Sequence, residues 1–256
     1  MDPTVSIWIQ LVARWFHVVG GVVWIGFLFF FALVQLEAFA AMGESRPGAA
    51  RELMPRGLWW FRWMAALTVA TGLVLLWIIY YVDDTVYDAA RDGNPAGTVA
   101  AIIGSLVAVA LYDQATARIE HAPTAHLISA ALLGATYWLF SGLAHFAPRA
   151  VWIHVGSAMG IALIVNVWIR VWPAAKNGIL PALAREDTPD PEAMKVIATR
   201  ARRSLYIAIP LLFLMISNHY PSLYASPNHG LYFSILVIAG WLFALACLRR
   251  AKGLRP

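Results

Sequence analysis

The hydrophobic residues of this chain fall into about seven long runs separated by shorter polar stretches. Most runs hold about 20 apolar residues, enough for a helix to cross a hydrocarbon core of roughly 30 Å. Because unpaired backbone groups are costly in lipid, such runs are expected to be helical. The predicted spans are residues 5–36, 58–81, 98–117, 124–146, 150–172, 204–219 and 231–248. Pro173 is expected to end the fifth span, and Pro210 lies inside the sixth.

The amino-acid composition also favours a membrane protein over a soluble one. The 256 residues are 61% hydrophobic and only 13% charged, whereas soluble domains are about 25% charged. No soluble domain is evident, so we predict one all-α, polytopic transmembrane domain over residues 1–256. The N-terminal Met-Asp-Pro-Thr lacks a basic stretch, which favours a retained first span over a cleaved signal peptide. The single Cys247 excludes an internal disulfide and a CxxCH attachment of c-type haem.

The charged residues predict an orientation in the bilayer. Basic loops alternate with neutral or acidic ones, and cytoplasmic loops of membrane proteins carry the excess of Lys and Arg. This rule places the N-terminus outside and the C-terminus in the cytoplasm. The net charge of +5 therefore reflects topology, and no nucleic-acid partner is expected. The fifth loop, of about 30 residues, is expected to be mainly a polar connector. The alternative is a solvated turn followed by a short amphipathic helix near Ala193.

A histidine in the first span draws attention to one helix face. At 3.6 residues per turn, His17, Gly20, Gly21 and Trp24 share a stripe. The two glycines leave a gap beside the imidazole. This face is suited to a flat cofactor or to a neighbouring helix.

His17 and His154 are both expected in the outer half of the bundle, where an imidazole normally faces the interior and has a partner. One interpretation is that each makes a helix–helix hydrogen bond, to a hydroxyl, a carbonyl or Asn166. A second is axial ligation of a b-type haem, with small residues making room for the porphyrin. The sequence leaves both open.

A third interpretation is a transition-metal or substrate site nearer the outer surface. His145 lies near the outer end of the fourth span, and His219 follows the sixth. With His154 and the amide of Asn218 they form a candidate site, and His17 is a further candidate metal ligand. Imidazole binds zinc, copper and iron, but no HExxH or CxxC spacing selects among them.

Several stretches resemble the membrane domain of the bacterial membrane-bound urate oxidases (urate hydroxylases). They are RWFHVVGGVVWIG at 14–26, LWWFRW at 58–63, WIHVGSAMG at 152–160 with NVW at 166–168, and FLMISNHYP at 213–221. The more specific motifs are IHVG, in the third of these stretches, and SNHYP, in the fourth. They are spread over most of the chain.

This resemblance implies oxidation of urate toward 5-hydroxyisourate in the bacterial inner membrane, with electrons passed to cytochrome c. His17 and His154 would then bind haem b or a transition metal ion, and Asn218 and His219 would contact the substrate or support its site. Family members often carry the cytochrome c as a C-terminal domain. Because this chain has no CxxCH, an external cytochrome c is expected as a separate partner.

The chain also departs from the family pattern at polar positions. Arg203, Ser204 and Leu205 stand where the family has His and Asn, and Ala32-Leu-Val-Gln35 stands where an asparagine is expected. These departures favour an alternative: a non-catalytic subunit, haem-binding or structural, of a larger respiratory or photosynthetic membrane complex. A transporter is a third class, but no inverted repeat supports it.

Overall fold

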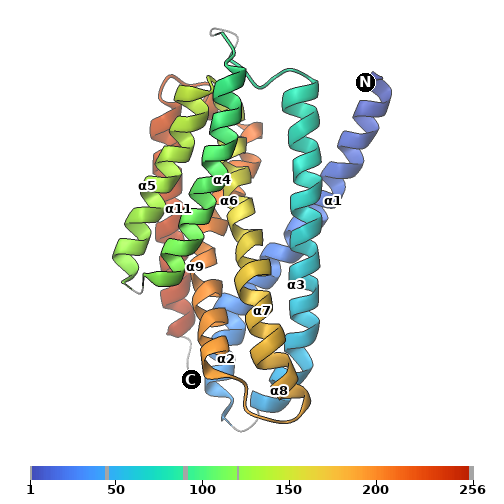
Figure 1. The fold of residues 1–256 in the computed structure, drawn as a ribbon, viewed down its shortest axis with the longest axis vertical. Helices are drawn as coiled ribbons and strands as arrows, with labels where there is room; N and C mark the ends of the chain where they lie inside the picture. Colours follow the sequence, from blue (N-terminus) through green and yellow to red (C-terminus); the bar gives the residue numbers. More distant parts are fainter. Residues whose placement is uncertain (1, 44–45, 89–91, 120, 254–256) are drawn as a thin grey trace. The chain divides into compact units, whose positions relative to one another are not determined.

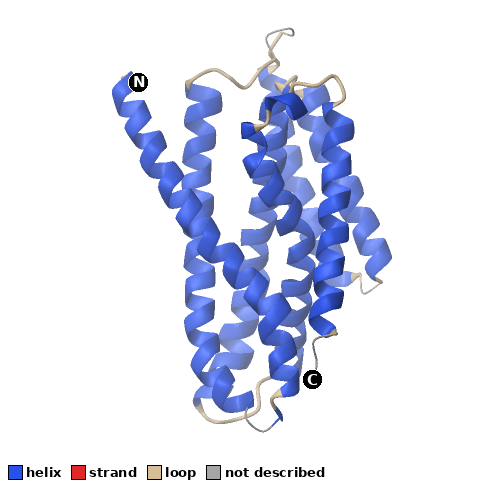
Figure 2. Cartoon of the chain, turned by 180° about the vertical axis from the view of Figure 1, so that it is seen from behind, coloured by secondary structure: helices blue, strands red, loops and turns tan. Residues whose placement is uncertain are grey.

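The computed structural model describes residues 2–43, 46–88, 92–119 and 121–253. All elements in this part of the chain are helical, as Figure 2 shows, which confirms the predicted all-α class. In chain order they are α1 Pro3–Phe29, η1 Phe30–Gln35, α2 Leu36–Ala41, α3 Arg46–Leu76, η3 Trp77–Val82, α4 Pro95–Arg118, α5 Ala122–Trp138, η4 Leu139–Leu143, α6 Pro148–Val165, η5 Asn166–Val171, α7 Trp172–Ala174, η6 Ala175–Ile179, α8 Leu180–Ala184, α9 Pro191–Ile216, η7 Ser217–His219, α10 Pro221–Tyr224 and α11 His229–Lys252 (Figure 1). The η segments are π-helical except η7, which is a 3₁₀ turn.

Among the described residues, 6 helices are long and apolar enough to cross a membrane. They are Pro3–Ala41, Pro47–Val82, Pro95–Arg118, Pro123–Leu143, Pro148–Ala184 and His229–Lys252, and they contain most of the predicted first five spans and the seventh. The chain is therefore a multi-pass membrane protein in a lipid bilayer. The predicted sixth span, 204–219, is largely the apolar half of α9, whose first half carries basic residues.

The fifth predicted span and the loop after it differ from expectation. Pro173 does not end the helix, which continues through α7, η6 and α8 to Ala184. Pro173 lies inside this continuous helix, directly after η5 and Trp172, and such local π adjustments satisfy the backbone groups that a proline leaves unpaired in a membrane helix. The predicted 30-residue loop is thus only residues 185–190. The expected amphipathic helix and the sixth span join into one helix, α9, because nothing breaks the helix between them.

Packing divides the chain into two compact units. The first unit comprises Met1–Ala13, Gly72–Ala162 and Leu211–Val237, and the second comprises Arg14–Thr71, Leu163–Pro210 and Ile238–Pro256. The boundaries fall inside α1, α3, α6, α9 and α11, so each of these helices contributes residues to both units.

The first unit has an aromatic core around α6. Trp152 and Tyr80 are almost fully buried, together with Phe140 and Phe146. The span containing α6 is also the most enclosed: 78% of its most apolar stretch is buried, against 11–33% in the other candidate spans. The outward faces of those other spans are therefore the ones left to lipid.

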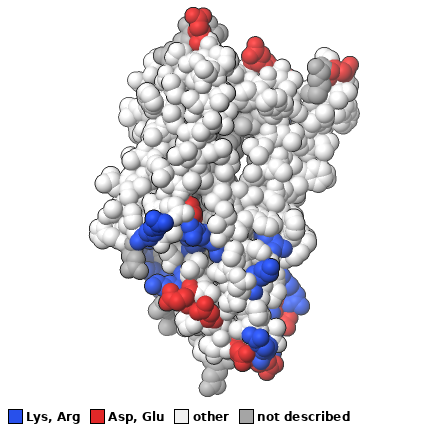
Figure 3. Space-filling model, viewed as in Figure 1, with Lys and Arg blue, Asp and Glu red and all other residues white. Residues whose placement is uncertain are grey.

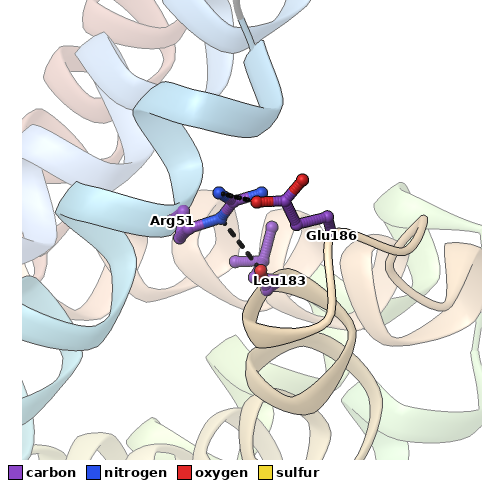
Figure 4. A network of polar contacts seen from close by, with 3 residues as sticks. All are labelled: Arg51, Leu183 and Glu186. Atoms are coloured by element: carbon purple, nitrogen blue, oxygen red, sulfur yellow. Dashed lines mark hydrogen bonds and ion pairs between the residues drawn. The ribbon is translucent and has the colours of Figure 1, made fainter.

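The second unit holds nearly all of the basic residues. Every Lys and Arg except Arg91, Arg118 and Arg149 belongs to it, and on the face in Figure 3 they gather together with Asp and Glu. Figure 4 shows one such contact: Arg51 pairs with Glu186 at 2.7 Å and donates from Nε to the Leu183 carbonyl at 3.0 Å. This contact ties α3 to the end of α8.

Candidate functional site

His154 lies on α6 in the first unit and is only 4% exposed. Its Nδ1 lies 2.8 Å from the backbone oxygen of Ala150. A carbonyl oxygen can only accept, so Nδ1 carries the proton and donates. Nε2 is then the acceptor, and it accepts from the Tyr81 hydroxyl at 3.0 Å. The imidazole is therefore held as one tautomer by two hydrogen bonds.

Aromatic rings enclose this imidazole. The ring centroids of Phe146, Phe140, Tyr80 and Tyr81 lie 4.8, 5.2, 5.3 and 5.8 Å from that of His154. With both nitrogens engaged and four rings around it, the site does not fit an axial haem ligand or a metal ligand unless Tyr81 is displaced. The hydrogen bond to a hydroxyl on another helix matches the first interpretation of this histidine.

His17 belongs to the second unit and is partly buried. Its Nδ1 donates to the Thr68 backbone oxygen on α3 at 2.8 Å, so it too makes a helix–helix hydrogen bond. A Cβ built on Gly20 would lie 2.7 Å from Thr68 Oγ1, and one on Gly21 would lie 3.7 Å from Thr68 Cγ2. The gap beside His17 is therefore filled by α3, and this face holds a neighbouring helix. The pairing of His17 with His154 stays a prediction.

His145 lies in the connection before α6 with a left-handed backbone, φ 57°. Its Nδ1 donates to the Asp92 backbone oxygen at 3.2 Å, and its own carbonyl accepts from Asp88 N at 3.3 Å. The side chain thus fastens this connection to the loop before α4. Within the described part of the chain, no group of three or more His, Cys, Asp or Glu could hold a metal ion. The metal assignment of His17, His145 and His154 stays a prediction.

A second polar cluster of the first unit joins Arg149, Asn218 and Tyr80. Arg149 lies in the first turn of α6 and donates from Nε to Asn218 Oδ1 at 3.1 Å. Its guanidinium carbon lies 5.8 Å from the centroid of the buried Tyr80 ring. His219, the next residue in η7, is exposed. The cluster offers a planar cation beside a buried aromatic ring and a carboxamide bound to that cation, and the imidazole of His219 follows next in the sequence.

Sequence reasoning identified the histidines and Asn218 but missed the two tyrosines. Tyr80 and Tyr81 end an aliphatic stretch next to Asp83 and Asp84, a pattern typical of an interfacial aromatic belt. The signal that separates them from such a belt is tertiary: the Tyr81 hydroxyl donates to His154, and Tyr80 is only 2% exposed. That signal exists only once η3 is packed against α6.

Comparison with known proteins points to one family. A family model described as urate oxidase N-terminal matches residues 43–252, most of the chain. The matched region contains His145, His154, Asn218 and His219 but not His17. Neither the curated proteins nor the solved structures gave a match.

Proposed function

Because the chain belongs to the urate oxidase N-terminal family, we propose that it is a urate-oxidase-like redox protein of the bacterial inner membrane. It binds urate at Arg149 and Asn218 and passes electrons to a cytochrome c outside the membrane. The observation that carries this proposal is the hydrogen bond between these two side chains. The orientation with the N-terminus outside belongs to the same proposal.

The chemistry of the cluster suits this substrate. Urate is a planar anion that presents carbonyl oxygens and N–H groups around its rim. The guanidinium fork of Arg149 matches such an anion with charge-assisted hydrogen bonds. The carboxamide of Asn218, oriented by Arg149, offers a donor and an acceptor to the rim. The buried ring of Tyr80 supports the guanidinium from one side.

The overall reaction has a simple balance. Urate and water give 5-hydroxyisourate, with release of an electron pair and a pair of protons; each cytochrome c accepts one electron. In this proposal the exposed imidazole of His219 accepts a proton as the hydroxyl forms. When bound, a haem b or a metal ion would carry electrons between urate and the cytochrome. Of the two histidines, His17 keeps a lone pair on Nε2 that could hold a metal ion, since its Nδ1 makes the hydrogen bond, whereas α3 fills the space beside it that a porphyrin would need.

The test is urate-dependent reduction of added cytochrome c by membranes that contain the chain. Arg149→Gln is expected to lower kcat/KM about 10- to 100-fold, because it removes a charged hydrogen bond to the anion. Arg118→Gln, at an exposed site at the end of α4, is the matched control. Equal activity of the two variants would rule out Arg149 as a substrate contact.

One observation favours a second candidate, a non-catalytic subunit of a larger respiratory or photosynthetic complex. The hydrogen bonds of His154 to Tyr81 and of His17 to Thr68 each join two helices, which suits a structural role for both histidines. This candidate predicts no urate-dependent reduction of cytochrome c and the co-purification of other membrane subunits. A visible spectrum of the purified protein separates its haem-binding and structural forms.

A further inference from the structure

A small cavity lies inside the second unit, and none of its lining residues belongs to the clusters around His154 and Arg149. It is bordered by the α1–η1–α2 helix, α3, η5 and α9, and it has room of about 30 Å³ for the centres of water molecules. Most of its wall is apolar, including Phe31, Met54 and Phe61. Its polar lining consists of Gln35, Asn166 and Ser204; no carboxylate or basic side chain lines it.

Two carbonyl oxygens of this lining lack partners. Gln35 and Asn166 are each only 7% exposed, yet Gln35 Oε1 and Asn166 Oδ1 have no hydrogen-bond partner among the described residues. The other end of the Asn166 amide is satisfied, because Nδ2 donates to Ser204 Oγ at 2.9 Å. Buried polar atoms are almost always hydrogen-bonded. We therefore expect both oxygens to accept hydrogen bonds from a donor other than the described residues.

The backbone around the cavity gives independent support. Gln35 is the last residue of the π-helical η1 and Asn166 is the first residue of the π-helical η5. π-helical turns inside α-helices are rare and occur frequently at functional sites. In a membrane protein, irregular helix is tolerated where it is buried in protein or lines a water-filled cavity. Each of these two segments thus places one unpartnered amide oxygen in the same cavity.

We propose that this cavity is a hydration site, in which ordered water donates to Gln35 Oε1 and Asn166 Oδ1. A water molecule needs roughly 10–15 Å³ of such room and two to four polar partners, so the cavity holds about two. The Ser204 hydroxyl completes the set. A cation would also suit amide oxygens, but the lining offers no carboxylate to balance its charge. This site is independent of the proposed urate-binding cluster of Arg149 and Asn218, whose residues belong to the first unit.

X-ray hydroxyl-radical footprinting tests the proposal, because water bound beside a buried side chain is radiolysed in place and oxidises it. Met54 lines the cavity and is 3% exposed, whereas Met159 is 7% exposed and does not line it. In the purified chain in nanodiscs, Met54 is expected to be oxidised several-fold faster than Met159. Oxidation of Met54 no faster than Met159 would overturn the proposal, and this comparison needs no variant.

A variant then tests the amides themselves. Gln35→Leu with Asn166→Leu removes both acceptors at similar volume, so Met54 oxidation is expected to fall to the level of Met159. An unchanged rate in the folded double variant would show that the amides do not hold the water. Native mass spectrometry that finds an organic molecule bound to the wild type and absent from the double variant would also contradict a hydration site. Neither result depends on whether urate is oxidised.

Discussion

Substitution of Gly20 by alanine tests how the α1 and α3 segments of the second unit approach each other. The new Cβ would lie 2.7 Å from Thr68 Oγ1, well inside an ordinary carbon–oxygen contact of about 3.3 Å or more. Thr68 cannot easily rotate away, because its Oγ1 donates to the Met64 backbone oxygen at 2.7 Å. The same crossing carries the hydrogen bond from His17 to Thr68, so a shift of α3 would strain that bond too.

The expected cost follows from two opposing terms. Overpacking of this kind costs about 1–3 kcal/mol, whereas replacing a helical glycine by alanine gains about 1 kcal/mol of helix propensity. Gly26 on the same helix separates the terms, because a Cβ there would meet nothing within 4 Å. Gly20→Ala is therefore expected to be about 1–3 kcal/mol less stable than Gly26→Ala.

The measurement is the free energy of unfolding in mixed micelles, from SDS titration followed by the fluorescence of the 12 tryptophans. Thr68→Ala removes the blocking hydroxyl, so in that background the difference between the Gly20 and Gly26 variants should shrink by an amount typical of contacting pairs, about 0.5–3 kcal/mol. Equal stabilities of the two glycine variants in the wild-type background would refute the close contact. A stability difference that persists in the Thr68→Ala background would show that a residue other than Thr68 causes it.

Three further substitutions have distinct expected outcomes. Tyr81→Phe leaves the buried acceptor of His154 without its donor and should cost about 1–3 kcal/mol in the same unfolding assay; no loss would contradict that hydrogen bond. Asn94→Ala removes the side-chain cap of α4 and should cost about 0.5–2 kcal/mol, whereas Asn94→Ser, which keeps a capping oxygen, should cost less. Glu186→Gln weakens an exposed ion pair with Arg51 and should change stability by under about 1 kcal/mol, with high salt removing the difference.

The hydrophobic pattern was sufficient to predict the helical class and most of the membrane spans. Runs of about 20 apolar residues leave little alternative to helices in lipid. The pattern could not place the end of the fifth helix, because a proline usually ends a helix and Pro173 does not. The π-helical η5 just before it lets the backbone accommodate this proline within one helix. The same limit applies to α9, where a basic amphipathic segment and an apolar one form one helix.

The sequence also predicted that His17 and His154 need partners, since a bare imidazole is costly in a membrane. It could not identify those partners. Tyr81 is 73 residues from His154 along the chain, and only the packing of η3 on α6 brings the two side chains together. The backbone oxygen of Thr68, which carries no sequence signature at all, is the partner of His17.

By itself, the sequence determined the all-α membrane class, the polar residues that a bilayer makes costly, and the two adjacent glycines that leave a gap in one helix face. Each follows from local chemistry and a helical period. The tertiary structure decided what fills the gap, which groups satisfy the histidines, and that Gln35 and Asn166 line one cavity. These outcomes depend on how helices far apart in the sequence pack together, and the residues next to a given position in the chain do not determine that packing.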